Sequence, residues 1–353
     1  MESMERKQKV LHLLQSDRFS GAENVVCQIM GMFRNTPNME MVYCSRDGQI
    51  REALAERNVP FVPIRTLTVT EVKRVLREQK PDIVHAHDMR ASFVAALCCG
   101  KIPLISHVHN NSFASRGLSV KSIAYLLAAR KAKHIFWVSK SACSGYAFGK
   151  WLKEKSSVLY NVIDIDALYQ RIMEDSMEAC YDVLYLGRLS APKNPTRLMF
   201  VLEKVVQKLP DIKIGIVGTG ELEEETKALC SALHLQNNVT FLGFQSNPLN
   251  ILKDAKVMIM TSLWEGTPMC ALEAMALGVP IVSTPTDGLC DLVSDGETGF
   301  LSDDDAVLAE RILEIVKNEQ LRTELSKASL KKIRKLMNRE AYMSELVDKY
   351  TKV

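Results

Sequence analysis

Thirteen short apolar runs, separated by longer stretches with helical patterning, place the strongest constraint on the fold of this sequence. Near-continuous apolar strands that alternate with helices are typical of parallel sheets covered by helices on both faces. The pattern therefore predicts an α/β protein. We expect its strands at 10–14, 41–44, 61–64, 82–87, 104–109, 134–139, 157–161, 182–187, 212–218, 239–243, 257–262, 280–284 and 299–301.

The order of these runs also predicts two domains. One sheet of thirteen strands would be too large for a single domain of this kind, and segment 162–181 is polar and has no strand pattern. We expect two doubly wound parallel-sheet domains, 1–165 and 166–338, and a C-terminal helix at about 339–353 that packs back on the first. Open parallel sheets bind ligands beyond the carboxyl ends of their strands, so a cleft between the two domains is the expected site.

The composition fits a globular protein, since 47% of the 353 residues are hydrophobic and 25% are charged. The longest apolar runs are shorter than the roughly 20 residues that span a bilayer. The charged N-terminus leads directly into the first strand, so no signal peptide is expected. The nine cysteines form no C-x-x-C motif. Reduced, buried thiols in a cytoplasmic protein are therefore expected.

The charge is distributed unevenly. Residues 1–165 contain 24 lysines and arginines against 14 aspartates and glutamates, which leaves +10, and the remainder carries −7. This asymmetry indicates that the first domain faces an anionic partner, although chance scatter of surface charge is an alternative. Segment 119–134 combines apolar residues with cations and could lie on an anionic membrane surface, although a core helix with solvated ends would give the same pattern. Its apolar members are Ile123, Tyr125, Leu126 and Leu127.

Segment 262–280, SLWEGTPMCALEAMALGVP, places two carboxylates at the start of a helix that is apolar on every side. We expect Thr267 as the N-cap of this helix and Pro268 as its first residue. The first free N–H groups would form a site suited to a phosphate. Those groups belong to Met269, Cys270 and Ala271.

The two carboxylates of this segment flank the expected phosphate site. Glu265 precedes the cap, and Glu273 lies about one and a half turns into the helix. Both can therefore accept hydrogen bonds from hydroxyls on either side of a bound diphosphate. A single exposed polar position at Glu273 is the alternative interpretation. The apolar neighbours argue against it, because a buried carboxylate requires partners.

Two further strand ends carry candidate ligand-binding residues. Arg188 and Lys193 follow a predicted strand in LYLGRLSAPKNP and could clamp a diphosphate, although two solvated surface cations would give the same pattern. Gly218 and Gly220 begin a dinucleotide fingerprint, but Glu223 stands where its third glycine is required. The glycine pair therefore indicates close backbone approach to a ligand rather than NAD binding.

Taken together, these residues resemble the family 4 retaining glycosyltransferases, which have the GT-B fold of two facing Rossmann-like domains. The resemblance covers most of the chain. In the second domain it rests on GRLSAPKNP, IVGTGELEEETKAL, VTFLGFQSN, EGTPMCALEAMALGVPIVST and DGETGFL, and the E-x7-E pattern of the family falls on Glu265 and Glu273.

The resemblance implies a nucleotide-sugar donor bound to the second domain. It implies that Arg188 and Lys193 hold the diphosphate, that Glu273 binds the ribose, and that Glu265 binds the transferred sugar. It places the base near the turn of Gly243 and Phe244. The remaining expected donor contacts are Gly218, Gly266, Thr267, Met269 and Cys270.

In the first domain, DRFSGAEN resembles the glycine-rich turn of the family, with Ser20 in place of its first glycine. This turn places Gly21 and Glu23 on the acceptor side. PDIVHAHD and PLISHVHN resemble two strand ends of the family that bear histidines. His87 is then expected on the acceptor side, and His109 is expected to contact the donor sugar.

Three details complete this comparison of the first domain with the family. His85 and His107 are expected to alternate to the other face of the sheet or to lie deeper. VLYNVID resembles the Asn-Gly-Ile-Asp hinge, with Val162 in place of glycine, so the hinge is expected to be stiffer. No metal is expected, because the Asp-x-Asp string at 164–166 lies in the linker and no His/Cys cluster has metal-binding spacing.

We therefore expect a retaining, metal-independent glycosyltransferase of the kind that builds bacterial polysaccharide or lipopolysaccharide. It would transfer a hexose from a UDP- or GDP-linked sugar to a hydroxyl of a glycan or lipid-linked acceptor. The helix start, Arg188 and Lys193 would stabilise the leaving diphosphate, and Glu265 and His109 complete the expected catalytic set. No cofactor and no nucleic-acid partner are expected. The expected location is cytoplasmic, including the cytoplasmic face of the membrane.

Three alternatives remain open. A nucleotide-sugar epimerase or hydrolase of the same fold would use no acceptor. An NAD-linked oxidoreductase is disfavoured by the incomplete fingerprint. A non-catalytic partner subunit is disfavoured because the set of Arg188, Lys193, Glu265 and Glu273 is complete.

Overall fold

The computed structural model describes residues 6–109, 113–173 and 180–352, and the chain divides into two compact units. Unit 1 comprises Met1–Asn161 and Arg339–Val353, and unit 2 comprises Val162–Asn338. The boundary predicted from the sequence, at 165/166, lies four residues beyond the one that the structure gives. The C-terminal segment is part of unit 1.

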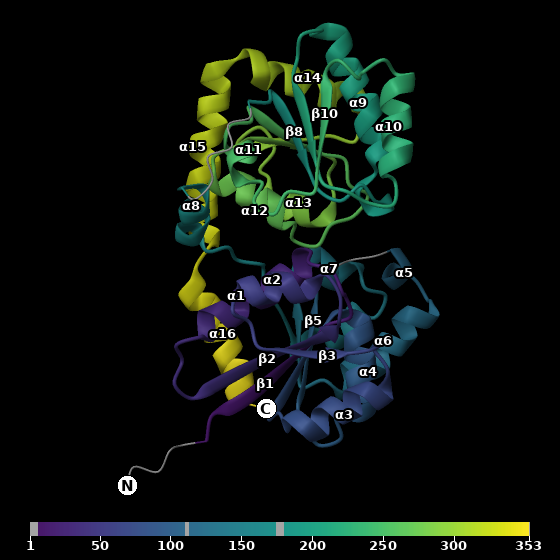
Figure 1. The fold of residues 1–353 in the computed structure, drawn as a ribbon, viewed down its shortest axis with the longest axis vertical. Helices are drawn as coiled ribbons and strands as arrows, with labels where there is room; N and C mark the ends of the chain where they lie inside the picture. Colours follow the sequence, from purple (N-terminus) through teal and green to yellow (C-terminus); the bar gives the residue numbers. More distant parts are fainter. Residues whose placement is uncertain (1–5, 110–112, 174–179, 353) are drawn as a thin grey trace. The chain divides into compact units, whose positions relative to one another are not determined.

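Unit 1 is built on a seven-stranded parallel sheet in the order β3-β2-β1-β4-β5-β6-β7 (Figure 1). The strand order reverses direction between β1 and β4, which defines a topological switch point there. The strands are β1 Gln8–Leu13, β2 Met39–Arg46, β3 Phe61–Ile64, β4 Ile83–His87, β5 Leu104–Val108, β6 His134–Trp137 and β7 Ser156–Val158.

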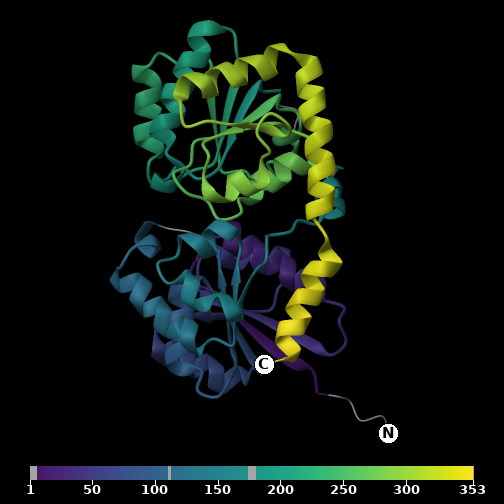
Figure 2. The same ribbon diagram turned by 180° about the vertical axis from the view of Figure 1, so that it is seen from behind.

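Helices cover both faces of this sheet. The C-terminal helix α16, yellow in Figure 2, lies beside β1 and contributes the buried Tyr350. The backbone carbonyl of Tyr350 accepts a hydrogen bond from the side chain of Gln8 at 2.9 Å. The centroid of the Tyr350 ring lies 6.2 Å from the centroid of the Phe33 ring. The helices are α1 Gly21–Phe33, α2 Ile50–Glu56, α3 Val69–Gln79, α4 Asp88–Cys98, α5 Phe113–Arg116, α6 Val120–Lys131, α7 Lys140–Gly145, the 3₁₀ turn η1 Gly149–Lys155, and α16 Arg339–Thr351.

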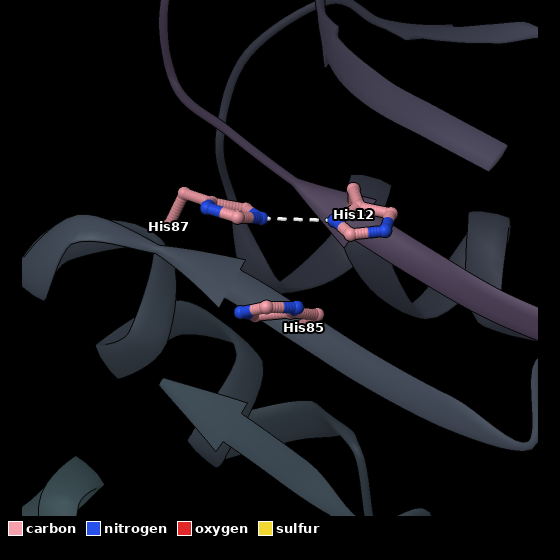
Figure 3. Close-up of side chains that lie close together, drawn as sticks. All are labelled: His12, His85 and His87. Atoms are coloured by element: carbon pink, nitrogen blue, oxygen red, sulfur yellow. Dashed lines mark hydrogen bonds between the residues drawn. The ribbon is translucent and has the colours of Figure 1, made fainter. Parts of the chain in front are cut away.

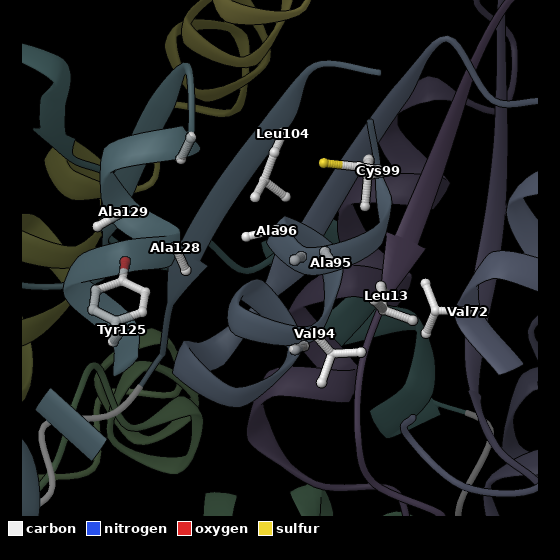
Figure 4. Close-up of a cluster of buried hydrophobic side chains, with 14 of the residues drawn as sticks. Leu13, Val72, Val94, Ala95, Ala96, Cys99, Leu104, Tyr125, Ala128 and Ala129 are labelled. Carbon is white, nitrogen blue, oxygen red and sulfur yellow. The ribbon is translucent and has the colours of Figure 1, made fainter. Parts of the chain in front are cut away.

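One hydrophobic core of unit 1 lies between the sheet and helices α3, α4 and α6 (Figure 4). Leu11 and Leu13 of β1 point into it, so the intervening His12 points to the opposite face, because successive side chains of a strand alternate. Helix α6 contributes Tyr125 and Leu126 to this core. Both were expected on a membrane-facing surface, and that prediction is wrong because they lie on the side of the helix that packs against α4.

Unit 2 is built on a six-stranded parallel sheet in the order β10-β9-β8-β11-β12-β13, and its switch point lies between β8 and β11. A second core of aliphatic side chains packs beneath helices α9 and α14. The strands are β8 Val183–Leu186, β9 Ile214–Val217, β10 Val239–Gly243, β11 Val257–Met260, β12 Ile281–Ser283 and β13 Gly299–Leu301.

The helices of unit 2 begin where local sequence signals place them. Asn194, at φ 51°, accepts a hydrogen bond from the backbone N–H of Arg197, and Pro195 is the first residue of α9. Asp304 caps α14 in the same way. The helices are α8 Ile165–Met173, the 3₁₀ turn η2 Ala191–Lys193, α9 Pro195–Lys208, α10 Glu223–Ala232, α11 Leu249–Lys253, α12 Met269–Ala276, α13 Asp287–Leu292, α14 Asp305–Lys317 and α15 Glu319–Leu336.

All thirteen predicted strands are present, and their ends differ from the predicted ends by at most three residues. The predicted α/β architecture of two doubly wound parallel sheets is therefore confirmed. In the part of the chain that the structure describes, no helix is both long enough and apolar enough to cross a membrane.

Candidate functional site

Most of the predicted donor-binding residues of unit 2 follow the carboxyl ends of β8 and β11. These two strands flank the switch point of the sheet, where open parallel sheets bind ligands. The loop after β8 carries Arg188 and ends in the 3₁₀ turn that contains Lys193. The loop after β11 carries Glu265 and leads into α12.

Glu265 and Lys193 connect these two loops. The Lys193 Nζ lies 2.5 Å from Glu265 Oε1, and the Ser262 hydroxyl donates to the same oxygen at 2.6 Å. Glu265 is 8% exposed, so water competes little for its carboxylate. Burial acts to lower the pKa of Lys193, but the Glu265 carboxylate outweighs this effect and raises that pKa above its usual value. The ammonium group is therefore charged and fixed at the switch point.

Backbone hydrogen bonds hold the two loops in register around this ion pair. The N–H of Leu263 donates to the carbonyl of Pro192 at 2.8 Å, and the Thr261 hydroxyl donates to the carbonyl of Lys193 at 3.2 Å. Arg188 is exposed, and its guanidinium has no hydrogen-bond or ion-pair partner among the described residues. Of the two predicted diphosphate cations, Arg188 is therefore available to a ligand without breaking an existing contact.

The start of α12 differs from the prediction by one residue. The helix begins at Met269, and Pro268, with an extended ψ of 123°, occupies the N-cap position that was assigned to Thr267. As at other N-caps, the backbone carbonyl of Pro268 accepts a hydrogen bond from the first turn of the helix, here from the N–H of Ala271 at 3.1 Å. Within the described chain, the backbone amides of Met269 and Cys270 remain without an acceptor. The predicted set of three free amides is thus reduced to two.

Glu273 lies one and a half turns into α12 among buried neighbours, and its own side chain is partly buried. Burial raises its pKa to about 7, against a smaller opposing effect of Arg171. No described residue donates a hydrogen bond to this carboxylate. The neighbouring Cys270 thiol has its pKa raised to about 12, mainly by burial, and is therefore not a nucleophile at neutral pH. Glu273 is a desolvated acceptor without a donor, which is the state expected of a ligand-binding group.

The glycine pair after β9 has a structural role that the sequence did not predict. A Cβ at Gly218, where φ is +129°, would lie 2.0 Å from the carbonyl oxygen of Gly187, and a Cβ at Gly220 would lie 2.1 Å from that of Leu189. The close backbone approach that the structure shows is to the loop after β8, and the approach to a ligand stays a prediction. The Gly218 N–H also donates to the carbonyl of Gly243 at 2.8 Å.

Gly243 and Phe244 lie at the end of β10, as the prediction for the base-binding turn requires. Gly243 has φ +65°, a conformation that favours glycine, and Phe244 is 68% exposed. A large aromatic ring exposed at the carboxyl edge of the sheet is suited to stacking on a base. The role of this ring in binding the base stays a prediction.

In unit 1, the predicted acceptor-side turn is present at the start of α1, where Gly21 is the first residue of the helix. The hydroxyl of Ser20 donates to Oε2 of Glu23, and Glu23 is buried. The serine that replaces the expected glycine therefore serves to position this carboxylate.

The two predicted strand-end histidines are in contact. Nδ1 of His87 lies 2.8 Å from Nε2 of His109, and both rings are buried. His85 and His107 lie deeper in the protein, as one of the two expected arrangements requires. They occupy the same face of the sheet as His87 and His109, with the His85 and His87 rings stacked 4.4 Å apart, because residues i and i+2 of a strand share a face. The expected alternation to the other face is therefore wrong.

Three residues of the unit 2 site were not predicted. Ser262 holds the Glu265 carboxylate, and its position three residues before that glutamate was the available signal. Arg171 of α8 acts electrostatically on Glu273. Gly288 lies so close to Gly266 that a Cβ would collide with the carbonyl oxygen of Gly266. No local pattern reveals the contributions of Arg171 or Gly288.

Two doubly wound parallel-sheet units, one of which carries cations and carboxylates at its switch point, are the arrangement expected of a GT-B protein. Two family profiles match the chain: Glycosyltransferase Family 4 over residues 19–167 and Glycosyl transferases group 1 over residues 175–332. The chain belongs to the family 4 type of glycosyltransferase with the GT-B fold.

Individual relatives support this assignment. An uncharacterized glycosyltransferase of Methanocaldococcus jannaschii is 31% identical over 264 residues, which are 66% of this chain and 64% of that one. The UDP-Gal:α-D-GlcNAc-diphosphoundecaprenol α-1,3-galactosyltransferase of Escherichia coli is 25% identical over 333 residues, 85% of each chain. The structure of Anabaena HepE in complex with UDP-glucose is similar in fold, with a TM-score of 0.86 and 22% identity over 98% of this chain and 100% of that one.

Proposed function

We propose that this protein transfers a hexose from a UDP-sugar to a hydroxyl of a lipid-linked or glycan acceptor, with retention of configuration and without a catalytic metal. The observation that carries the proposal is the juxtaposition, at one switch point, of the Lys193–Glu265 pair with two α12 amides and the Glu273 carboxylate, none of which has a hydrogen-bond partner among the described residues. UDP is favoured over GDP because the E. coli relative is named for UDP-Gal and HepE was crystallised with UDP-glucose.

The proposed donor site is arranged for a diphosphate with sugars at both ends. The amides of Met269 and Cys270 and the guanidinium of Arg188 would bind phosphate oxygens. They would also stabilise the charge that develops on the diphosphate as the glycosidic bond breaks. The Lys193 ammonium adds a positive charge that stays in place because Glu265 holds it. These groups perform the task that a divalent ion performs in other transferases, so we propose a metal-independent reaction.

The two carboxylates have different proposed roles. Glu273, which lacks a donor, would accept hydrogen bonds from the ribose hydroxyls. Glu265 would orient the transferred sugar, because its Oε1 is already occupied by Lys193 and Ser262. A carboxylate so engaged is a weak nucleophile, which favours reaction on one face of the sugar without a covalent intermediate over the double displacement of retaining hydrolases.

We assign the acceptor-side roles to unit 1. Gly21 and Glu23 would contact the acceptor, and His109 would contact the donor sugar. His87, whose two ring nitrogens contact His12 and His109, would act by positioning His109. The acceptor is proposed to be lipid-linked because the E. coli relative is named for a diphosphoundecaprenol substrate. We also propose that unit 1 rests on the cytoplasmic face of an anionic membrane.

The surface of α6 supports this membrane proposal. Val120, Ile123 and Leu127 form an exposed apolar stripe at helical spacing, with exposures of 86%, 50% and 57%, and Leu118 precedes it. The exposed cations Lys121 and Arg130 lie on the same helix. An apolar stripe flanked by cations matches an anionic lipid surface in both hydrophobicity and charge.

A ligand panel combined with product analysis tests the proposed reaction. UDP should raise the melting temperature of the chain more than GDP, ADP or TDP at equal concentration, because a ligand that binds only the folded state stabilises it. Product analysis with a lipid-linked acceptor should give a glycoside with the anomeric configuration of the donor. Sugar released or epimerised equally without acceptor would establish the epimerase or hydrolase alternative instead.

The two carboxylates can be separated by kinetics. Glu265→Gln should lower kcat on the order of 10²-fold, about 2.7 kcal/mol, because contacts to the transferred sugar change most in the transition state. Glu273→Gln should mainly raise the donor KM, because the ribose surroundings change little. Glu225→Gln, an exposed site on α10, is the control. If Glu265→Gln loses affinity for UDP alone while Glu273→Gln keeps it, the two roles are reversed.

A further inference from the structure

Five of the seven histidines of this chain form one buried cluster in unit 1. They come from three adjacent strands of the sheet, β1, β4 and β5, and lie on the face opposite the core of Figure 4. Neighbouring rings are separated by 4.1 to 5.5 Å between centroids. The members are His12, His85, His87, His107 and His109.

The cluster contains more polar nitrogens than the described residues satisfy. Nε2 of His12, Nε2 of His85, both nitrogens of His107 and Nδ1 of His109 are buried and have no partner among the described residues. An unsatisfied buried polar group is unfavourable for folding. Five such atoms in one place require an explanation, and a bound ion or an ordered water is the usual one.

Three of the rings lie together at the switch between β1 and β4, with the His85 ring beneath those of His12 and His87 (Figure 3). Nδ1 of His12 lies 3.0 Å from Nε2 of His87. One ring nitrogen of His85 lies within 4.8 Å of both. Tetrahedral coordination with Zn–N bonds of about 2.0–2.1 Å places nitrogens about 3.4 Å apart. Small rotations about the broad histidine χ2 torsion can bring the three atoms to that spacing.

We propose that His12, His85 and His87 bind a divalent transition-metal ion, with Zn²⁺ as the best fit. Imidazole is a preferred ligand of zinc, and three protein nitrogens with one remaining position is a common zinc arrangement. The site belongs to unit 1, whereas the proposed donor-binding residues belong to unit 2. Its ion would stabilise the fold of unit 1 and orient neighbouring side chains rather than activate the diphosphate.

The groups behind two of the ligands support this proposal. Metal-binding histidines almost always use their second nitrogen in a hydrogen bond that fixes the ring. Nδ1 of His85 lies 2.7 Å from the Tyr350 hydroxyl, and Nδ1 of His87 lies 2.8 Å from Nε2 of His109. With an ion on Nε2 of His87, its Nδ1–H donates to His109. The proposed ion would therefore fix the position of a histidine that is assigned to the sugar site.

Metal titration of the full-length chain without a histidine tag tests the proposal. After removal of bound metal with a chelator, Co²⁺ should bind at one ion per chain and give the visible absorption of a tetrahedral site. Zn²⁺ should displace it and raise the melting temperature. Circular dichroism of the metal-free chain verifies that unit 1 remains folded. Absence of stoichiometric binding by the folded chain would overturn the proposal.

Three variants identify the ligands. His12→Asn should weaken Co²⁺ and Zn²⁺ binding at least tenfold. Tyr350→Phe keeps the ring packing and removes only the hydroxyl, so it should weaken binding about 10- to 100-fold with the fold retained. His234→Asn is the control, because His234 lies in unit 2 at φ 57°, which asparagine tolerates. The affinity of His234→Asn for Co²⁺ and Zn²⁺ should equal that of the native chain.

A neighbouring set of rings provides the competing arrangement. His87, His107 and His109 also bring one nitrogen each within 4.8 Å of one another. If His107→Asn abolishes binding while His12→Asn and Tyr350→Phe leave it unchanged, the proposed ligand set is wrong. If His12→Asn fails to fold, Tyr350→Phe and the ring ¹⁵N shifts of His12 on Zn²⁺ addition in the native chain decide the question. An unshifted His12 ring would refute its role as a ligand.

Discussion

Replacing Glu273 with glutamine should stabilise the ligand-free protein, and more so at higher pH. In the fold, burial raises the pKa of this carboxyl from its usual 4.5 to about 7. The contribution of the Glu273 carboxyl to the free energy of unfolding is therefore most favourable below about pH 4.5, and it is lost as the pH rises through 7. At 1.36 kcal/mol per tenfold change in proton affinity, the loss reaches at most about 3 kcal/mol at pH 8. Glutamine carries no charge and avoids this loss.

The assay is urea unfolding of the native chain and of Glu273→Gln at pH 5 and pH 8. Hydrogen exchange of the β11 amides in the same samples reports on unit 2 specifically. The stability advantage of the variant should grow by roughly 2 kcal/mol between the two pH values, since part of the effect is already present at pH 5. Glu225→Gln, on the exposed face of α10, should show no such growth.

An advantage that is the same at both pH values would refute this reasoning. It would mean that the carboxyl titrates normally in the folded protein, so that Glu273 finds a donor or enough water to stay charged. The same argument predicts that UDP binding at pH 6.5 releases a proton, because ribose hydroxyls would stabilise the ionised form. Calorimetry in two buffers of different ionisation enthalpy measures that release.

Three further predictions concern packing and surface. In urea unfolding, Lys193→Met should destabilise unit 2 by about 3–5 kcal/mol because it leaves the Glu265 carboxylate buried and unpaired. Adding Glu265→Gln should recover part of that loss, and strictly additive losses would contradict a coupled pair. Gly218→Ala should destabilise by more than about 2 kcal/mol because its Cβ meets a carbonyl oxygen, whereas Gly31→Ala, within α1 and with nothing within 4 Å, should raise the melting temperature slightly. Ile123→Asp should abolish sedimentation of the chain with anionic vesicles and leave its melting temperature unchanged; equal binding of the native chain to neutral vesicles would refute the charge argument.

The sequence by itself determined the secondary structure and the class of fold. The predicted strands 61–64, 239–243 and 299–301 match the observed ones residue for residue, because apolar runs bounded by polar and glycine-rich segments have few other ways to be buried. The start of α9 is explained by Asn194 and Pro195, whose conformational preferences are local. The α12 prediction was off by one residue, since the extended ψ of Pro268 depends on how the preceding loop packs.

The positions of the donor-site residues could be predicted, but their contacts could not. Strand order places the loops of β8 and β11 side by side, and the carboxyl ends of parallel strands share one edge. The sequence therefore identified Arg188, Lys193 and Glu265 as neighbours of one site. That Lys193 contacts Glu265, 72 residues away, depends on side-chain geometry within two packed loops. The approach of Gly218 to Gly187 likewise depends on the packing of two loops against each other.

Only the tertiary structure decided that the histidines form one cluster. No spacing along the chain relates His12 to His85 or His87 to His107. In the sheet, however, His12 of β1 pairs with His85 of β4, and His87 of β4 pairs with His107 of β5. Register is set by the packing of the whole sheet between its helices, because a shift of one residue would exchange its buried faces. A sequence pattern identifies which residues are buried in each strand, whereas the residues that meet across strands are fixed by the pairing of segments far apart in the chain.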